Sequence, residues 1–334
     1  MRPLLLALMA AVPAIATPAA ADEVVDRTLA DIVLPAFRGF AEATAALAEV
    51  ASGDCRAANP ALRAAFQTAF DAWIPVSYFH AGPMEEDGRN LAIAFWPDPI
   101  GSTPKALRQL LARDGRLLAD GASYARASVA ARGLAGLQAM LYDPDFNGYG
   151  PDDVGCRLVR AAAAELAANG AALDAEWQGF AQLLRSAGPG NPRFLSVSEA
   201  RQYLYTSLLG GMQFDDEQRL TRPLGTVERP RPERAEARAS GRSLRNVQLS
   251  LAAATKLAQS LSPAGAPQTF AALAEARQLA ETLDDPIFDA VATPAGRARL
   301  LALRTAIHHA GEYAKGEIGS ELGVSAGFNS LDGD

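Results

Sequence analysis

The chain contains three histidines, and two of them precede a glutamate at a spacing suited to one helix face. His308 and His309 lie four and three residues before Glu312, so a helix would bring imidazole and carboxylate groups together. Such groups bind zinc or iron, although first-row metal sites usually need three or four ligands. Because Lys315 and Glu317 follow, the stretch is also typical of a solvated polar face. His309 with Glu312 is therefore kept only as an alternative metal site.

Other catalytic signatures are absent from the sequence. His80 precedes an acidic run at residues 85–87, which is more typical of a solvated turn than of a cation site. There is no HExxH zinc helix, no GxSxG elbow, no phosphate-binding GxxxxGK[ST] loop and no CxxC pair. The residues alone therefore predict no catalytic centre.

A single amide, Gln138, interrupts an apolar run between Arg132 and Asp143. Leu134 and Leu137 would share an apolar helix face, and the amide lies among such residues. A lone amide in this position is either a hydrogen-bonded buried group or part of a site. The run itself leaves both interpretations open.

The elements that must position these residues are predicted to be helices. Alanine and leucine dominate, and no stretch alternates convincingly with the period of two that a strand requires. An N-cap residue followed by proline marks helix starts at Asn59, Thr103 and Thr293, and a capping box opens at Ser196. The helices are expected at 23–51, 60–75, 104–113, 121–142, 152–186, 196–218, 241–261, 267–283 and 294–321. The expected fold class is all-α.

Two stretches rich in glycine or proline divide this helical pattern. The segment 186–194, "SAGPGNPRF", predicts two helical-bundle halves packed against each other, at residues 22–190 and 191–334. The segment 222–241 is a long, charged connection, and such a loop is usually functional or packs across another domain.

The N-terminal segment is typical of an export signal. Residues 1–21 combine Arg2, an apolar stretch and small residues before the expected cleavage point, and the apolar stretch is shorter than the ~20 residues of a membrane span. We therefore expect an exported protein of the periplasm or cell envelope, with no transmembrane segment. In that setting Cys55 and Cys156 favour one disulfide over two buried free thiols. A net charge of −7 and 7% aromatic residues argue against a nucleic-acid partner.

Longer stretches of the sequence resemble the imelysin-like family of bacterial envelope proteins. They are "AFDAWIPV" at 69–76, "FWPDPIGSTPKALRQLL" at 95–111, "RPLG" at 222–225, "EARASGRSLRNVQLSL" at 236–251 and "LGVSAGFNSLDGD" at 322–334. The resemblance implies an all-helical fold of two bundle-like halves with a functional site where they meet. It also implies an association with iron uptake, and the founding members were described as metallopeptidases.

The family's GxHxxE motif resembles the stretch from Gly133 to Gln138. Gly133 matches the glycine, but Ala135 stands where the histidine would be and Gln138 where the glutamate would be. A methyl group cannot bind a metal, and an amide cannot act as a general base. A metal or peptidase centre built on this motif is therefore not expected here.

These observations lead to one main functional hypothesis and two alternatives. We expect a non-enzymatic envelope protein that binds a small ligand or a protein partner in iron or metal acquisition. The alternatives are a metallopeptidase with a non-standard metal site and a scaffold for an envelope complex. No cofactor is expected, with iron or another divalent metal kept as the alternative.

A candidate ligand site between the halves is expected to combine residues of two distant stretches. Arg242 would hold an anionic ligand through its planar guanidinium or, equally, either be solvated at a helix start or form a salt bridge between the halves. The candidate residues are Gly133, Gln138, Ser240, Arg242, Ser243 and Asn246.

Overall fold

The computed structural model describes residues 22–112, 118 and 121–325. Within these ranges every regular element is a helix and no strand occurs, which confirms the expected all-α class. The expected export signal at residues 1–21 and most of the family-like ending at 322–334 lie outside the described residues. No helix in the described part of the chain is long and apolar enough to cross a membrane.

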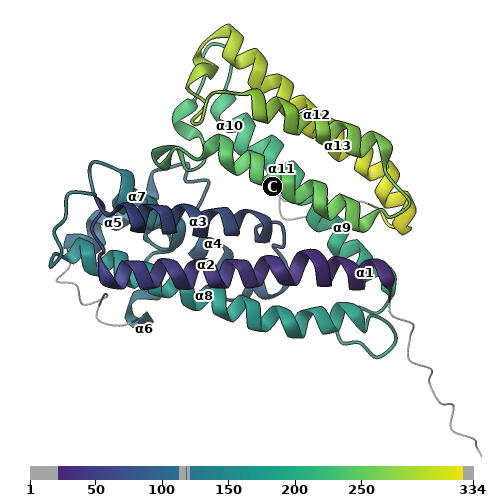
Figure 1. Ribbon diagram of the computed structural model, residues 1–334, viewed down its shortest axis with the longest axis horizontal. Coiled ribbons are helices and arrows are strands. Elements are labelled where there is room, and N and C mark those ends of the chain that lie inside the picture. The colour runs from purple at the N-terminus through teal and green to yellow at the C-terminus, as the bar shows by residue number, and fades with distance from the viewer. Residues whose placement is uncertain (1–21, 113–117, 119–120, 326–334) are drawn as a thin grey trace, which may run out of the picture.

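The first group of helices, called here the N-terminal group, is built around α2, α3 and α8, which run alongside one another (Figure 1). A π-helical turn at Leu29–Val33 joins α1 to α2, so the chain is helical from 23 to 53. Phe37 stacks on Trp177 of α8 at 4.5 Å between ring centroids, and both side chains are fully buried. The helices of this group are α1 (Glu23–Thr28), α2 (Leu34–Gly53), α3 (Pro60–Val76), α4 (Arg89–Ile93), α5 (Ser102–Ala112), α6 (Gly121–Tyr124), α7 (Gly133–Tyr142) and α8 (Val154–Arg185).

The second, C-terminal group contains the long pair α12 and α13, with α11 on the side that faces the first group (Figure 1). Its helices are α9 (Val197–Phe214), α10 (Thr221–Leu224), α11 (Ser243–Leu261), α12 (Pro267–Thr282) and α13 (Pro294–Leu322). Helix α11 packs against α1 and α3, where the hydroxyls of Thr28 and Ser260 are hydrogen-bonded at 2.8 Å. The predicted boundary at residue 190 stays a prediction.

One predicted helix is wrong as a continuous element. The stretch 121–142 forms α6, then a 3-10 turn at Val129–Ala131, and then α7. Gly133 begins α7 with φ +56°, and a Cβ atom there would collide with the carbonyl oxygens of Ala92 and Ile93. Because this break depends on the close approach of α4, the local pattern of apolar residues does not reveal it.

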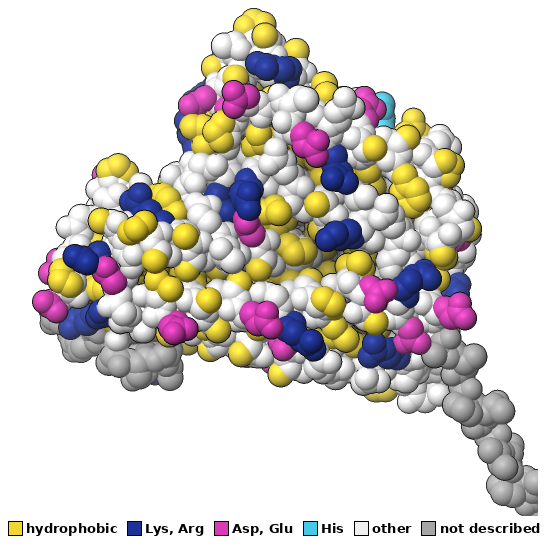
Figure 2. Space-filling view, viewed as in Figure 1, with side chains coloured by type: hydrophobic (Ala, Val, Ile, Leu, Met, Phe, Trp, Pro, Cys, Tyr) yellow, Lys and Arg dark blue, Asp and Glu magenta, His cyan; other side chains and the backbone are white. Residues whose placement is uncertain are grey.

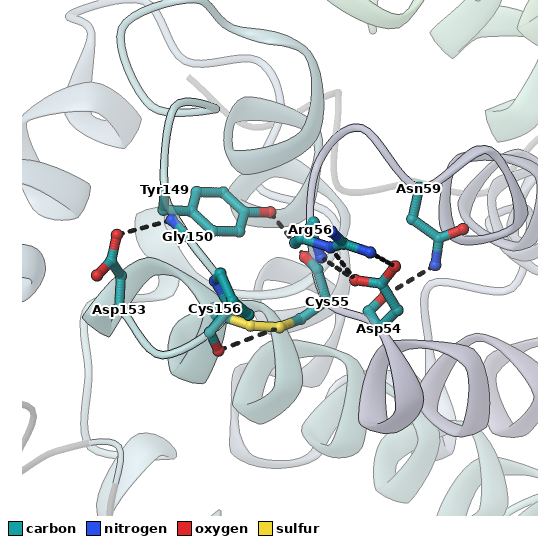
Figure 3. Close-up of a disulfide and its surroundings, with 9 residues drawn as sticks. Asp54, Cys55, Arg56, Asn59, Tyr149, Gly150, Asp153 and Cys156 are labelled. Atoms are coloured by element: carbon teal, nitrogen blue, oxygen red, sulfur yellow. Dashed lines mark hydrogen bonds and ion pairs between the residues drawn. A yellow bond between two sulfur atoms is a disulfide. The ribbon is translucent and has the colours of Figure 1, made fainter.

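The predicted disulfide joins the end of α2 to the first turn of α8 (Figure 3). Cys55 and Cys156 are bonded, with their Cα atoms 5.3 Å apart, which confirms the prediction. Tyr149 donates its hydroxyl to the Cys55 carbonyl at 3.0 Å and covers the bridge. Beside it, hydrogen bonds from Arg56 lower the pKa of Asp54 to about 2.

Candidate functional site

A cavity of about 210 Å³ lies between α7 and the connection that precedes α11, and we call it the inner cavity. Helix α7 contributes Ala135 and Gln138 to its wall, and the connection contributes Glu236, Ala237 and Ala239. Aromatic side chains form much of the remaining wall, namely Phe70, Phe95, Trp96 and Phe146. The site therefore combines an apolar lining with a few polar groups, the usual composition of a small-molecule pocket.

Gln138 is hydrogen-bonded across this cavity wall to Ser240. The Ser240 hydroxyl donates to Gln138 Oε1 at 2.8 Å, and it lies also 3.0 Å from the Ala237 carbonyl oxygen. Gln138 Nε2 donates no hydrogen bond to any residue in the described ranges, so both N–H groups of the half-buried amide are left for a bound molecule. Two of the sequence-predicted residues, 102 positions apart, are thus in contact: Gln138 lines the cavity, whereas Ser240 is not among the lining residues.

Arg242, the third of these residues, forms a salt bridge, which was one of its expected roles. Its guanidinium donates to Asp71 Oδ1 and to Gln67 Oε1, both at 2.5 Å, and lies 4.7 Å from the Phe70 ring centroid. The side chain is 1% exposed. Burial raises the pKa of Asp71, whereas the hydrogen bonds and charges of Arg245 and Arg242 lower it. The net result is a pKa below its ordinary value. The positive charge of Arg242 is therefore already matched within the protein.

Ser243 and Asn246 lie behind the cavity wall and hold Glu236. Ser243 donates its hydroxyl to the Glu236 carbonyl at 2.7 Å, and the Asn246 amide donates to Glu236 Oε2 at 2.9 Å. Neither residue is among the cavity-lining residues, and Gly133 contributes its backbone shape at the start of α7. A direct ligand contact for these three residues stays a prediction.

Sequence reasoning missed a buried ionic cluster beside the inner cavity. Arg219 donates to Asp215 Oδ1 and to Glu236 Oε2, each at 2.7 Å, and all three side chains are buried. Burial raises the pKa of Asp215 to about 6, against the opposing effect of Arg219. The spacing of Asp215 and Arg219 is the only local signal for this cluster, because Glu236 reaches it from the connection.

The ionic cluster borders a second cavity of about 170 Å³ that contains His80. Trp96 and Glu236 line both cavities, so they form part of the wall between them. Burial and the nearby Arg219 lower the pKa of His80, which keeps its imidazole neutral near pH 7. The acidic run 85–87 does not enclose a metal with His80, since no three potential metal-binding side chains gather within the described ranges.

The alternative metal pair on α13 is not assembled into a ligand set. Glu312 Oε1 accepts a hydrogen bond from Lys315 at 2.6 Å, and His309 lies beside the Tyr313 ring. His308 instead contacts Asp216, with 3.1 Å between Nδ1 and Oδ2. Neither His309 nor Glu312 is among the residues that line the cavities described above.

A wider cavity of about 650 Å³ adjoins the inner cavity, and we call it the mouth. Both cavities are lined by Trp96, Asp98 and Gln138, so the mouth leads to the hydrogen-bonded amide. The connection supplies most of the remaining lining through its basic residues: Arg222, Arg231, Arg234 and Arg238. On the face shown in Figure 2, by contrast, basic and acidic side chains are interspersed.

The fold and the cavities define an all-helical protein with a candidate ligand site between two groups of helices. Residues 33–312 match the family model of imelysin (peptidase M75), and the chain belongs to that family. An imelysin-like protein from Psychrobacter arcticum 273-4 has a similar solved structure, with a TM-score of 0.76 and 21% sequence identity. The similarity covers 91% of this chain and 96% of the other. No curated protein sequence matches the chain.

Proposed function

We propose that this protein is an exported, non-catalytic member of the imelysin family that binds a small ligand in the inner cavity. The observation that carries the proposal is the Gln138–Ser240 hydrogen bond, which leaves the Gln138 Nε2 donor directed to no described residue at the cavity wall. An apolar, partly aromatic cavity with such a donor suits a molecule that offers an acceptor. The resemblance to envelope proteins associated with iron uptake supports iron or metal acquisition as the setting.

The side chains of α7 support binding rather than hydrolysis. Ala135 and Gln138 both line the inner cavity. By the resemblance to the family's GxHxxE motif, they stand at the positions of its histidine and its glutamate. Neither a methyl group nor an amide takes up a proton near neutral pH, so this pair supplies no general base. Nor do three potential metal-binding side chains gather anywhere in the described part of the chain. The described residues therefore provide no metal centre that would support the family's peptidase designation.

Metal analysis of the purified protein tests the non-catalytic part of the proposal. We expect no stoichiometric ferrous, ferric, zinc or cupric ion after titration and desalting, and no change in His309→Ala. Chelator-sensitive peptide hydrolysis that survives rigorous purification would overturn the proposal and favour a metallopeptidase. If transcription of the gene does not respond to iron limitation and its deletion leaves iron uptake unchanged, the proposed role in iron acquisition is refuted.

Gln138→Leu tests the binding site directly. The leucine keeps the approximate size of the side chain but removes both polar atoms, while the Ser240 hydroxyl retains the Ala237 carbonyl as a partner at 3.0 Å. We therefore expect a stability change within about 1 kcal/mol. Small molecules that copurify with the wild type, identified by mass spectrometry, should be lost from the variant. Equal recovery from both proteins would refute a site at Gln138.

A further inference from the structure

The mouth carries more positive than negative side chains, although the protein as a whole has a net charge of −7. Of its described lining residues, four are arginines and two are carboxylates. The charged residues are Arg222, Arg231, Arg234, Arg238, Asp98 and Glu233. A local excess of this kind in a concave site attracts anions and holds them more strongly than a flat surface does.

Neither carboxylate of the mouth forms an ion pair with Arg222 or Arg234, although the charge of Arg234 helps to lower the pKa of Glu233. Asp98 accepts the backbone N–H groups of Ser102 and Thr103, at 2.8 and 2.7 Å, and so caps the start of α5. Glu233 is paired with Arg231 at 3.2 Å. Asp98 is therefore committed to the start of α5, and the single charge of Glu233 is shared between Arg231 and Arg234.

The other arginines are held by the protein, whereas Arg222 and Arg234 form no ion pair with a carboxylate of the described residues. Arg238 donates to Asp289 at 2.5 Å and to the Ile287 carbonyl at 2.7 Å. Arg222 reaches only the neutral amide oxygen of Gln218, at 3.3 Å. The Arg234 side chain forms no hydrogen bond or ion pair within the described ranges.

Arg222 and Arg234 lie close enough for their charges to repel each other. Burial and the positive charge of Arg234 lower the pKa of Arg222. Two guanidinium groups with unused donors around one cavity form a site that a carboxylate or phosphate can bridge, since each fork offers paired N–H groups. An anion would also relieve the repulsion between them.

The backbone that carries these arginines is fixed before any ligand binds. The Arg231 N–H donates to the Pro223 carbonyl at 2.9 Å, which closes the connection into a loop. Arg297 of α13 donates to the Leu224 carbonyl at 2.6 Å and to the Thr226 carbonyl at 3.1 Å. A fixed loop lowers the ordering cost of binding and therefore favours a specific site.

We propose that the mouth is an anion subsite, in which Arg222 and Arg234 together bind a carboxylate or phosphate group of the ligand. The inference rests on the proposed function and names the ligand class as a small organic anion. The anionic end stays in the mouth, because Asp143 and Glu236 line the inner cavity but not the mouth and would repel it. The uncharged remainder of the ligand extends inward past Trp96 toward Gln138.

Calorimetric titration with citrate and with pyrophosphate tests the subsite on the full mature chain, in low salt and in 150 mM sodium chloride. The two probes separate a preference for carboxylate from one for phosphate. We expect Arg222→Gln and Arg234→Gln each to weaken the binding of the tighter-binding probe about tenfold. The matched control is Arg229→Gln, an exposed arginine of the same connection that lies outside the mouth, and it should stay within about twofold.

Two results would overturn the anion subsite whatever the outcome at Gln138, and a third does so in combination with Gln138→Leu. One is the absence of binding by both probes at millimolar concentration, and the other is an equal loss in Arg229→Gln and the mouth variants. If copurified ligand disappears in Gln138→Leu while the mouth variants bind both probes normally, the inference fails and the proposed function stands. If the mouth variants lose the probes while Gln138→Leu keeps its copurified ligand, the anion subsite stands and the inner-cavity site fails. Unchanged circular dichroism of each variant excludes unfolding as the cause.

Discussion

At the scale of single residues, Arg219 is shared by two carboxylates, and all three side chains are buried. Its guanidinium lies 2.7 Å from oxygens of both Asp215 and Glu236, and Asp215 Oδ2 has no hydrogen-bond partner among the described residues. One positive charge faces two negative ones, so the cluster favours an additional proton. Burial accordingly raises the pKa of Asp215 from its ordinary value of 3.8 to about 6.

This raised pKa predicts a pH-dependent stability difference between the wild type and Asp215→Asn. As pH rises from about 4 to about 6, the unfolded chain releases this proton while the folded chain retains it, so wild-type stability falls through this window. The variant lacks the group. Its free energy of unfolding relative to wild type should therefore increase by up to about 3 kcal/mol between pH 4 and pH 7. Urea unfolding over a pH series measures the difference.

Glu217→Gln is the control for this prediction, because Glu217 is an exposed carboxylate on the same π-helical segment. It should shift the pH profile by much less than Asp215→Asn does. Parallel profiles for wild type and Asp215→Asn would contradict the raised pKa.

The candidate site was partly predictable at this scale. Gln138 stood out as a lone amide in an apolar helix face, and the family resemblance placed Gln138 and Ser240 in one candidate site. Their direct contact was not predictable, since 102 residues separate them. Asp215 and Arg219 were missed because charged residues are normally exposed, and only the folded chain reveals that both are buried.

At the scale of elements, helix starts were well predicted because they depend on neighbouring residues. Asn59, Ser196 and Thr293 each accept a hydrogen bond from a backbone N–H in the first helical turn, as their sequence patterns indicated. Helix α5 instead begins at Ser102 and is capped from outside by Asp98. The break before α7 was not predicted, because contacts with the backbone of α4 enforce it.

The disulfide between α2 and α8 predicts a loss of stability when it is removed. Cys55→Ser removes a link between the end of α2 and the start of α8, across a sequence separation of 101 residues. In the chain-entropy model such a link stabilises the folded protein by roughly 4–5 kcal/mol, and measured effects are often smaller. We expect a lower melting temperature than wild type under oxidising conditions. After reduction with dithiothreitol the two proteins should melt alike, and an equal difference in both conditions would argue against the bridge.

At the scale of the whole molecule, the two groups of helices meet through polar contacts between distant parts of the chain. Tyr78 of the N-terminal group contacts the Ser250 hydroxyl of α11 at 2.9 Å, and Arg27 donates to the Ser260 carbonyl at 2.7 Å. The segment 186–194 and the family resemblance predict two bundles, but the sequence does not show which helix faces meet. The position of the cavities was therefore available only from the structure and, as an expectation, from the family resemblance.

The arrangement of the two groups predicts unequal roles for two neighbouring arginines that share Asp71. Arg242 is buried, with a side chain 1% exposed, whereas the side chain of Arg245 is 55% exposed. Arg242→Gln removes a buried guanidinium that donates to the partly buried acceptors Gln67 and Asp71 of α3, so we expect a loss of about 2–3 kcal/mol in the free energy of unfolding. Arg245→Gln removes a solvent-exposed partner and should cost under about 1 kcal/mol. Urea unfolding measures both losses, and hydrogen exchange should show faster opening of α3 and α11 in Arg242→Gln alone. Equal losses would mean that Arg242 does not join the two groups of helices.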